Sequence, residues 1–375
     1  MLLTPGPTPV PEFARVAMSG QTLHHRTPEF EAIFEETREL LLKMYDMPEV
    51  LILASSGTGA MEASLRNLCT KKALVINSGK FGQRFTQICE AFDMDFIELK
   101  NAWDTPVCLD EVKKTLEQNK DIDTICVQIC ESSGGLRQPA EELAKLAKKI
   151  NPNIMIIADG ITAFGVEQVD TKNIDAYIAG SQKAMMLPPG LSFIGLSKKA
   201  VEKLESSSRG YYLNLWLELK KQKQNTTAWT PATTLIIGLK AVLEKIKAEG
   251  LENLYEATAL RAKASKKALE ALGLKIYPKT PAKAMSTVYL ENANELRKIL
   301  KNKYNVNIAG GQDGLKNKIF RINNMGFVED FETSWVLNAI ELALDEMKIR
   351  KFDSTANKVF LESTYNKDIK SCQNV

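Results

Sequence analysis

The segment Ile178-Ala-Gly-Ser-Gln-Lys183-Ala-Met-Met-Leu-Pro-Pro-Gly190 decides how the fold is interpreted. An apolar run that ends in small residues is typical of a buried strand leading into a loop, and ligands of α/β sheets bind where such strands end. Lys183 stands at that point, before a Pro-Pro-Gly turn. A partly desolvated lysine has a lowered pKa and a more nucleophilic amine. The segment therefore indicates that Lys183 binds a ligand. The opposing interpretation is that it is a solvated surface charge, as most lysines are.

Length and composition are those of a soluble globular protein. The chain has 375 residues, more than one hydrophobic core usually supports, so we expect a large domain with a smaller companion. Hydrophobic residues make up 44% of the chain and charged residues 25%, and the net charge is +3. So small a net charge favours neither nucleic acid nor a membrane surface as a partner.

The cysteines and histidines do not form a metal-binding pattern. The two histidines are adjacent and no two cysteines form a CxxC pair, so no metal site is predicted. Mostly buried free thiols fit a reducing compartment. The first residues do not form a signal peptide and no apolar run reaches transmembrane length, so we expect a cytoplasmic location. The cysteines are Cys69, Cys89, Cys108, Cys126, Cys130 and Cys372.

The N-terminal part, residues 1–20, is predicted to be an arm. Proline fixes φ and removes a donor, so the segment Thr4-Pro-Gly-Pro-Thr-Pro9 cannot be a helix or an inner strand, and we expect it to lie extended over the rest of the protein. After His24-His25-Arg26, apolar residues at near-helical spacing predict a helix from about Phe30 to Met44.

Strand and helix patterns then alternate, which predicts a mostly parallel sheet with helices on both faces. We assign residues 21–250 to this large domain. The predicted strands cover 51–53, 73–77, 124–128, 154–158, 176–180 and 192–196, with a helix over 140–150. Two long helices follow, ending near 249 and 272.

The remainder predicts a small α+β domain and a tail. Residues 251–352 contain strand patterns at 286–290, near 306 and at 319–321, and helix patterns at 294–303 and 333–347. Residues 353–375 are polar and contain lysines, so we expect a partly loose C-terminal tail.

The turn Ser56-Gly57-Thr58 separates a strand from a helix. Such a turn directs backbone N–H groups and a helix dipole at one point, which suits a phosphate. The same residue types also serve as plain helix caps, so both interpretations stay open. The turn lacks the Gly-Lys-Ser/Thr ending of a P-loop and the Gly-x-Gly-x-x-Gly fingerprint, which argues against a nucleotide.

Two further strand exits carry candidate site residues. An apolar strand stops at Asp159, whose carboxylate is either the partner of a cation or protonated ring nitrogen, or a cap of the next helix. Phe81 follows the strand at 73–77 and either packs in the core or covers the face of a planar cofactor. Together, Lys183, Asp159, the Ser56 turn and Phe81 meet the needs of pyridoxal 5′-phosphate: a Schiff-base lysine, a pyridinium partner, a phosphate cradle and a stacking group.

With these residues in place, the sequence resembles the class V (fold type I) PLP-dependent aminotransferases of the serine–pyruvate / alanine–glyoxylate group. The resemblance spans about Leu3 to Met347. It implies a large domain with a mostly parallel seven-stranded sheet and a smaller α+β C-terminal domain. It rests on Thr4-Pro-Gly-Pro7, Ser56-Gly-Thr-Gly59, Gly79-Lys-Phe-Gly82, Glu131-Ser-Ser133, Asp159, Ser181-Gln-Lys183, Pro188-Pro-Gly190, Thr230-Pro231 and Arg321.

The resemblance also implies residue roles. Lys183 would be the Schiff-base lysine and would carry the substrate's α-proton as general acid and base. Asp159 would be the pyridinium partner, and Ser132 would donate a hydrogen bond near the ring hydroxyl. Arg321 would hold the substrate carboxylate through its bidentate fork, and Gly6 would line the substrate pocket. The phosphate would be held by Ser56, Gly57, Thr58, Gln182 and, from the second subunit of a homodimer, Thr230.

Two positions depart from the family pattern. Phe81 stands where the alanine–glyoxylate enzymes often have tryptophan, so the stacking area is smaller. Thr227 stands where some members have a tyrosine, three residues before the phosphate-binding threonine. Neither change removes a group that the chemistry requires.

The implied reaction is a ping-pong transfer of an amino group from a small amino acid, such as alanine or serine, to glyoxylate or pyruvate. Phosphoserine aminotransferases also have a His-Arg pair followed by x-x-Glu-Phe, where it helps to hold the substrate phosphate, so transfer from phosphoserine to 2-oxoglutarate through Arg26 is an alternative. The pair is also common in the wider class V group, so a structural or dimer-contact role for His24 and His25 stays open. An alternative of another class is a non-catalytic α/β protein that binds a phosphate ligand. A cysteine desulfurase is disfavoured because no cysteine lies in an obvious Gly/Ser-rich loop.

Overall fold

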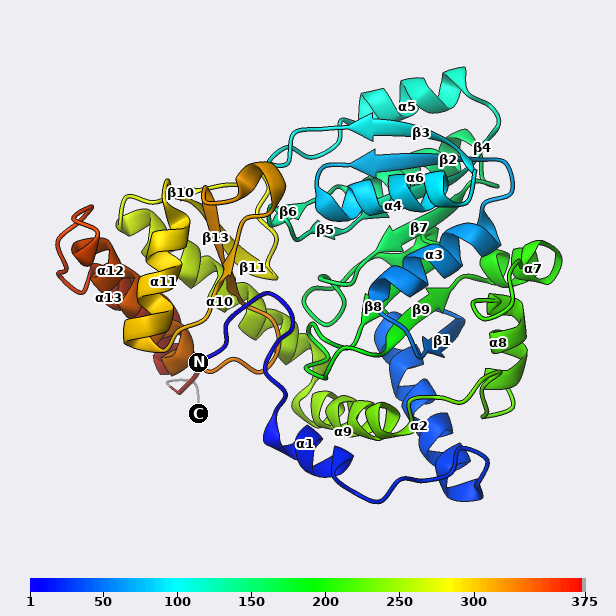
Figure 1. Cartoon of the computed structure of the whole chain (residues 1–375), viewed down its shortest axis with the longest axis horizontal. Helices are drawn as coiled ribbons and strands as arrows, with labels where there is room; N and C mark the ends of the chain where they lie inside the picture. The colour runs from blue at the N-terminus through cyan, green and yellow to red at the C-terminus, as the bar shows by residue number, and fades with distance from the viewer. Residues whose placement is uncertain (373–375) are drawn as a thin grey trace.

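A seven-stranded sheet forms the centre of the larger domain (Figure 1). The computed structural model describes the backbone of residues 1–372 and the side chains of residues 1–365. The strand order is β1-β9-β8-β7-β4-β2-β3; β9 is antiparallel to both neighbours and all other adjacent pairs are parallel, which confirms the predicted sheet. Its strands are β1 (Glu49–Leu53), β2 (Lys72–Asn77), β3 (Asp95–Lys100), β4 (Ile122–Gln128), β7 (Met155–Asp159), β8 (Ala176–Gly180) and β9 (Ser192–Leu196).

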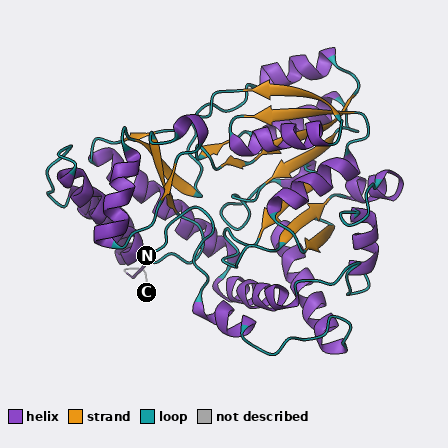
Figure 2. Ribbon diagram, viewed as in Figure 1, coloured by secondary structure: helices purple, strands orange, loops and turns teal. Residues whose placement is uncertain are grey.

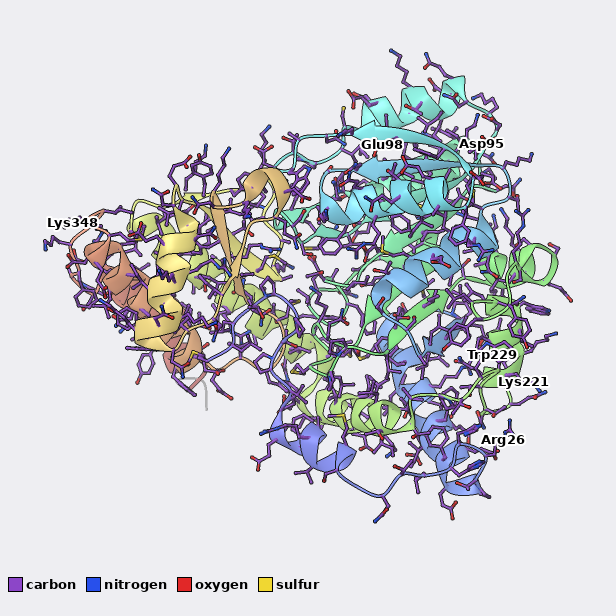
Figure 3. All side chains as sticks on the ribbon, viewed as in Figure 1. Arg26, Asp95, Glu98, Lys221, Trp229 and Lys348 are labelled. Atoms are coloured by element: carbon purple, nitrogen blue, oxygen red, sulfur yellow. The ribbon has the colours of Figure 1, made fainter. Side chains whose placement is uncertain are left out.

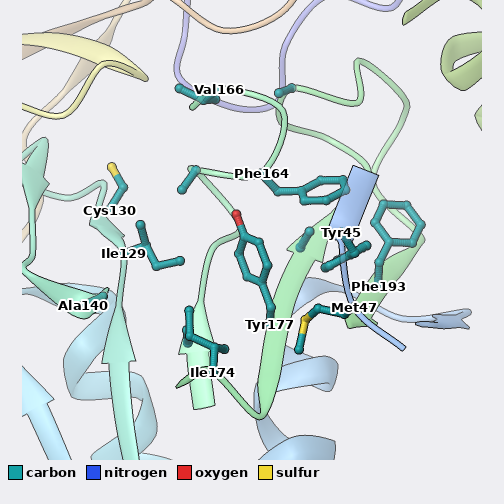
Figure 4. Packing of buried hydrophobic residues seen from close by; sticks show 14 of the residues in the cluster. Tyr45, Met47, Ile129, Cys130, Ala140, Phe164, Val166, Ile174, Tyr177 and Phe193 are labelled. Carbon is teal, nitrogen blue, oxygen red and sulfur yellow. The ribbon is translucent and has the colours of Figure 1, made fainter. Parts of the chain in front are cut away.

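Helices cover both faces of this sheet because successive side chains of a strand point to opposite sides. In β4, Ile125 and Val127 enter one apolar core and Cys126 enters the other. Figure 4 shows part of the first core, where the Tyr45 ring stacks on Phe164 at a centroid distance of 4.3 Å. The helices of the first core are α2 (Pro28–Tyr45), α5 (Leu109–Gln118), α6 (Ala140–Ile150) and α9 (Thr233–Glu249). Those of the second are α3 (Gly57–Leu68), α4 (Lys80–Ala91), α7 (Lys198–Ser207) and α8 (Leu215–Gln222).

The C-terminal part builds a second core around an antiparallel sheet of order β10-β11-β13-β12 (Figure 2). The predicted smaller α+β domain is thereby confirmed. We propose that the division between the domains lies at Gly250, where α9 ends and the next helix begins. The elements are α10 (Leu251–Ala271), β10 (Lys275–Ile276), β11 (Met285–Tyr289), α11 (Ala293–Tyr304), β12 (Ala309–Gly310), the 3-10 turn η2 (Asp313–Leu315), β13 (Ile319–Asn323), α12 (Asp330–Glu346) and α13 (Thr355–Cys372).

The N-terminal arm joins the two domains. The Leu3 backbone N–H donates to the Asn307 carbonyl at 2.8 Å, and the Leu3 carbonyl accepts from the Asn323 backbone N–H at 2.9 Å. The arm then crosses toward the large domain, where helix α1 (Glu12–Met18), not predicted from the sequence, packs against α9 (Figure 1). Residues 4–9 therefore pass between the domains.

Much of the segment 353–375, for which a partly loose tail is expected, is helical. Helix α13 packs against α10 and α12, because Ala356 and Phe360 are apolar and fully buried there. Residues 373–375, and the side chain of Cys372, lie outside the described part. The five described cysteines are free, and only Cys108 among them is exposed.

The sequence patterns also miss β3 and α5. Strand β3 lies at the edge of the sheet and none of its residues is fully buried, so it lacks the apolar run of an inner strand. Helix α5 buries only Val112 and Leu116, too few for a clear helical period. Among the described residues, no helix is both long and apolar enough to cross a membrane.

Candidate active site

The carboxyl ends of the sheet strands surround a cavity of about 130 Å³. Parallel strands place these ends at one edge, where α/β sheets bind ligands. A wider opening of about 870 Å³ beside Arg137, Asp170 and Lys172 contains none of the predicted site residues, so we locate the site by its chemistry rather than by volume. The smaller cavity is lined by Ser56, Gly57, Thr58, Phe81, Arg84, Cys130, Ser132, Asp159, Ile161, Thr162, Gln182 and Lys183.

Lys183 lies beneath the N-terminal arm, with 9% of its surface exposed. Its Nζ donates to the Pro5 carbonyl at 2.6 Å. A Cβ at Gly6, where φ is +99°, would lie 2.4 Å from that Nζ, so only glycine fits there. Thr8 fixes the lysine's backbone, because its Oγ1 donates to the Lys183 carbonyl at 2.7 Å. Burial, and secondly the nearby Arg321 charge, lower the pKa of Lys183 to about 8.

The loop that carries Lys183 is held by Ser181. The Ser181 Oγ donates to the Pro188 carbonyl at 2.8 Å and accepts from the Leu191 backbone N–H at 3.2 Å. The Leu187 backbone N–H donates to the Ser181 carbonyl at 3.0 Å. These contacts close the turn between β8 and β9 and fix where Lys183 leaves the sheet.

Asp159 ends β7 with 4% of its surface exposed. Its Oδ1 accepts from the Ile161 backbone N–H at 3.0 Å, in a turn and not at the start of the helix that one of the two interpretations expected. This bond leaves Oδ2 for another donor. Burial, and then the Glu131 charge, raise the pKa of Asp159 to about 7, while Arg84 and Lys183 oppose the rise. A cation or protonated ring placed here would return the carboxylate to its charged form.

The first turn of α3 has the features of an anion cradle. Ser56 is the N-cap residue, but its side chain makes no capping hydrogen bond, so the hydroxyl is not used by the helix. A Cβ at Gly57 would lie 2.3 Å from Ile161 Cδ1, so a larger residue would require the Ile161 side chain to shift. Nearby, the buried Gln182 Oε1 has no hydrogen-bond partner.

Phe81 lies in the first turn of α4 and is held by a buried carboxylate. The backbone N–H groups of Phe81 and Gly82 donate to Glu131 Oε2 at 3.0 and 2.9 Å. Glu131 Oε1 accepts from the backbone N–H and Oγ of Ser133 at 3.0 and 2.6 Å. Glu131 thus ties α4 to the hairpin of β5 (Cys130–Glu131) and β6 (Leu136–Arg137). Burial raises the pKa of Glu131.

Arg321 reaches the same edge from β13 of the small domain. Its Nη1 donates to the Ser132 carbonyl at 2.6 Å and its Nη2 to the Gly310 carbonyl at 2.6 Å. Its Nε donates to Gly310 as well, so two of the five guanidinium N–H groups remain for another acceptor. Burial lowers the pKa of Arg321 to about 10.

The predicted residues Arg26 and Thr230 do not line this cavity. Both are exposed, and Thr230 borders a separate small cavity together with Trp229. Figure 3 shows Arg26 and Trp229 at the side of the large domain remote from the small domain. Within one chain, the other predicted residues come together without these two.

The cavity is also lined by four residues that were not predicted from the sequence: Arg84, Cys130, Ile161 and Thr162. Arg84 follows Phe81 by three positions, so helical spacing alone would have placed it on the same face. Cys130 directly precedes the polar loop that was singled out. Within the described part of the chain, no cluster of His, Cys, Asp and Glu residues could hold a metal ion.

The cavity fits pyridoxal 5′-phosphate on its own geometry. The unused cap hydroxyl of Ser56 lies at the anion cradle, and the unpaired acceptor Gln182 Oε1, the buried amine of Lys183 and the carboxylate of Asp159 belong to residues that line the same cavity. Buried polar groups normally have partners, so the buried Gln182 Oε1, which has none, indicates that the cavity takes a polar ligand.

Comparisons with known proteins agree with this chemistry. The model of the aminotransferase class-V family matches residues 12–326. An uncharacterized aminotransferase of Helicobacter pylori is 47% identical, covering 97% of this chain and 99% of that protein. A Thermus thermophilus aspartate aminotransferase of subgroup IV is 33% identical with a TM-score of 0.86, covering 92% of this chain and 99% of that chain. A Hyphomicrobium methylovorum serine–glyoxylate aminotransferase is 28% identical, covering 92% and 89%.

These matches set aside the alternative of a non-catalytic phosphate-binding protein. The family match covers most of the chain, and relatives above 30% identity extend over nearly all of it. The chain belongs to the class-V aminotransferases and is a transaminase of PLP fold type I that uses pyridoxal 5′-phosphate.

Proposed function

We propose that this transaminase moves an amino group from a small amino acid, such as alanine or serine, to a 2-oxo acid such as glyoxylate or pyruvate. The observation that carries the proposal is the meeting of Lys183, Asp159 and the first turn of α3 in one cavity, with Arg321 beside it. The serine–glyoxylate relative supports glyoxylate as the acceptor.

Each residue then has one task. Bound pyridoxal 5′-phosphate supplies a ring that accepts electrons from the substrate's α-carbon. Lys183, whose pKa of about 8 leaves a usable fraction of free amine near neutral pH, removes and returns the α-proton at Nζ. Asp159 pairs with the ring nitrogen, Phe81 covers the ring and Ser132 donates to its hydroxyl. Arg321 directs its two free N–H groups at the substrate carboxylate, beside Gly6.

The phosphate would be bound by Ser56, Gly57, Thr58 and Gln182. We place Thr230 at the phosphate of the second subunit's site, because it is exposed and does not line the cavity of its own chain. The working enzyme would then be a homodimer with shared sites. The free thiols of the described cysteines support a cytoplasmic location.

Phosphoserine remains the second candidate substrate because of His25-Arg26. Arg26 does not line the cavity of its own chain, so it would have to serve the site of the other subunit. Arg26 is exposed, and its guanidinium forms no ion pair with a described residue, so it is available for such a role.

A panel of amino donors tests both candidates. Initial rates are measured for alanine, serine, aspartate and phosphoserine against glyoxylate, pyruvate and 2-oxoglutarate, in wild type and in Arg26→Ala. We expect alanine or serine with glyoxylate to be fastest, and Arg26→Ala to leave these rates unchanged. A phosphoserine rate that is highest in wild type and falls about 10-fold or more in Arg26→Ala, as loss of a charge-assisted contact predicts, would replace the proposal with the alternative.

A further inference from the structure

The cavity contains a cation, Arg84, that none of the roles above uses. We propose that Arg84 binds the phosphate group of pyridoxal 5′-phosphate and completes the cradle on the first turn of α3. The inference rests on the cofactor site described under the proposed function.

The Arg84 side chain runs from α4 to the cradle. Its guanidinium carbon lies 4.8 Å from the centroid of the Phe81 ring, three positions earlier on the same helix. Its Nη1 donates to Thr58 Oγ1 at 3.0 Å, and Thr58 is the second residue of α3. The guanidinium therefore stands between the residue proposed to cover the ring and the turn proposed to hold the phosphate.

Among the described residues Arg84 forms no ion pair, although its charge acts on the Asp159 carboxylate. The one hydrogen bond of Arg84 goes to a neutral hydroxyl. Other cations nearby differ: Lys80 Nζ lies 2.9 Å from Asp313 Oδ2, and Arg137 contacts Glu141 and Glu167 at 2.6 and 2.8 Å. A guanidinium has five N–H donors, so most of those of Arg84 are left for a ligand.

A phosphate at this cradle needs such a charge. The N-terminus of α3 contributes roughly half of an elementary charge, and a phosphate monoester carries close to two negative charges near neutral pH. Ser56 and Thr58 are neutral, and the Lys183 amine is directed at the Pro5 carbonyl. The planar fork of arginine also matches phosphate geometry. Arg84 is the cavity-lining group that supplies the missing positive charge.

The rival role for Arg84 is purely local. It could support the Phe81 ring and the Asp159 carboxylate without touching the phosphate. Such a role would affect the binding of the ring and not that of the phosphate. A ligand that has the ring but lacks the phosphate therefore distinguishes the two roles.

The test titrates the cofactor-free protein with pyridoxal 5′-phosphate and with pyridoxal, following visible absorbance. We expect Arg84→Ala to weaken the affinity for pyridoxal 5′-phosphate about 10- to 100-fold, which is the effect of losing a charge-assisted hydrogen bond. The affinity for pyridoxal should be unchanged. Inorganic phosphate should compete with pyridoxal 5′-phosphate in wild type and compete less in the variant. Arg84→Lys, which keeps the charge without the fork, should lie between the two.

Two further variants guard the interpretation. Arg84→Gln can still donate to Thr58, so it should fold as wild type does and yet lose the preference for the phosphorylated ligand. Lys80→Ala removes a cation from the same helix that is already paired with Asp313, and it should change neither affinity.

Three outcomes would overturn the inference. Equal weakening of both ligands would assign Arg84 to the local role, and unchanged affinity for both would assign it none. If wild type itself fails to bind pyridoxal 5′-phosphate, the proposed site fails and the inference falls with it. That result is distinct, because it appears before any variant is compared.

Discussion

At the scale of single residues, the site contains ionisable side chains whose charged forms are destabilised by burial. Burial lowers the pKa of Lys183 to about 8 and raises that of Asp159 to about 7, so both pKa values lie near neutral pH. Titratable groups shifted by their surroundings are typical of sites that move protons near neutral pH. The cofactor-free protein therefore carries an electrostatic cost that the cofactor relieves.

Asp159→Asn should reveal this cost. The Asp159 pKa is raised from 3.8 to about 7 in the folded protein, so the folded state holds the proton more tightly than the unfolded state. The contribution of Asp159 to the stability of the wild type is therefore fully present below pH 3.8 and is lost as the pH rises from there through about 7. Each pKa unit corresponds to about 1.4 kcal/mol of free energy of unfolding. Asparagine carries no charge and avoids this loss, so the cofactor-free variant should unfold at a higher temperature than wild type above pH 7.

Thermal unfolding of the cofactor-free proteins from pH 4 to 8 measures this effect. The variant and wild type should converge at the acidic end and separate toward pH 8. Asp110→Asn, at an exposed position of α5, should follow wild type throughout. A variant curve parallel to that of wild type would show that Asp159 does not titrate in this range.

The residue types at the site were predictable, but their environments were not. Lys183 and Asp159 stand out because a charged residue directly after an apolar strand is costly unless it has a task. The cavity-lining Arg84 and Cys130 give no such signal. Helical spacing places Arg84 on the face of Phe81 but does not show that its side chain reaches the cavity, and Cys130 continues an apolar run, so the tertiary arrangement is needed to place both in the cavity.

At the scale of elements, Glu131 joins the two loops that shape the site. One oxygen holds the start of α4, which carries Phe81, and the other holds Ser133, next to the Ser132 carbonyl that accepts from Arg321. All four groups that contact Glu131 are donors in this arrangement. A carboxylate satisfies four donors, whereas an amide brings two donors of its own.

Glu131→Gln should therefore destabilise the site although it keeps the shape of the side chain. At least one backbone N–H would face the amide NH₂, and an unsatisfied buried group costs about 1–3 kcal/mol. We expect a lower unfolding temperature and weaker retention of pyridoxal 5′-phosphate, measured by thermal unfolding and by absorbance after gel filtration. Glu62→Gln on α3, where the half-buried carboxylate has only a long contact of 3.9 Å to Arg66, should be neutral in both. Unchanged stability and unchanged retention in Glu131→Gln would contradict this role.

Element prediction succeeded where one face or both faces of an element are buried. The helix at 140–150 and the inner strands appear at or near their expected positions because their apolar patterns reflect burial. The edge strand β3 and helix α13 were not predicted, for opposite reasons. β3 is too exposed to show a pattern, whereas α13 is buried along a narrow line that includes Ala356 and Phe360 within a polar sequence.

At the scale of the whole molecule, the site is built by segments that are distant in the sequence. The N-terminal arm is bound to the small domain at Leu3 and to the large domain through α1, and it presents the Pro5 carbonyl to Lys183 between them. The small domain contributes Arg321 from β13. The two-part division was expected from chain length and alternation of elements, but the route of the arm depends on contacts that no local pattern records.

The central claim is that Lys183 is the residue to which pyridoxal 5′-phosphate becomes attached. The most direct measurement is borohydride reduction of the cofactor-loaded protein, followed by mass spectrometry of its peptides. We predict a yellow protein whose visible absorbance disappears on reduction, with the added mass on the peptide containing Lys183. Lys183→Ala should lack both the absorbance and the label, and Lys172→Ala, at an exposed lysine, should keep them. A label on another lysine, or a colourless wild type that takes up no pyridoxal 5′-phosphate, would contradict the account.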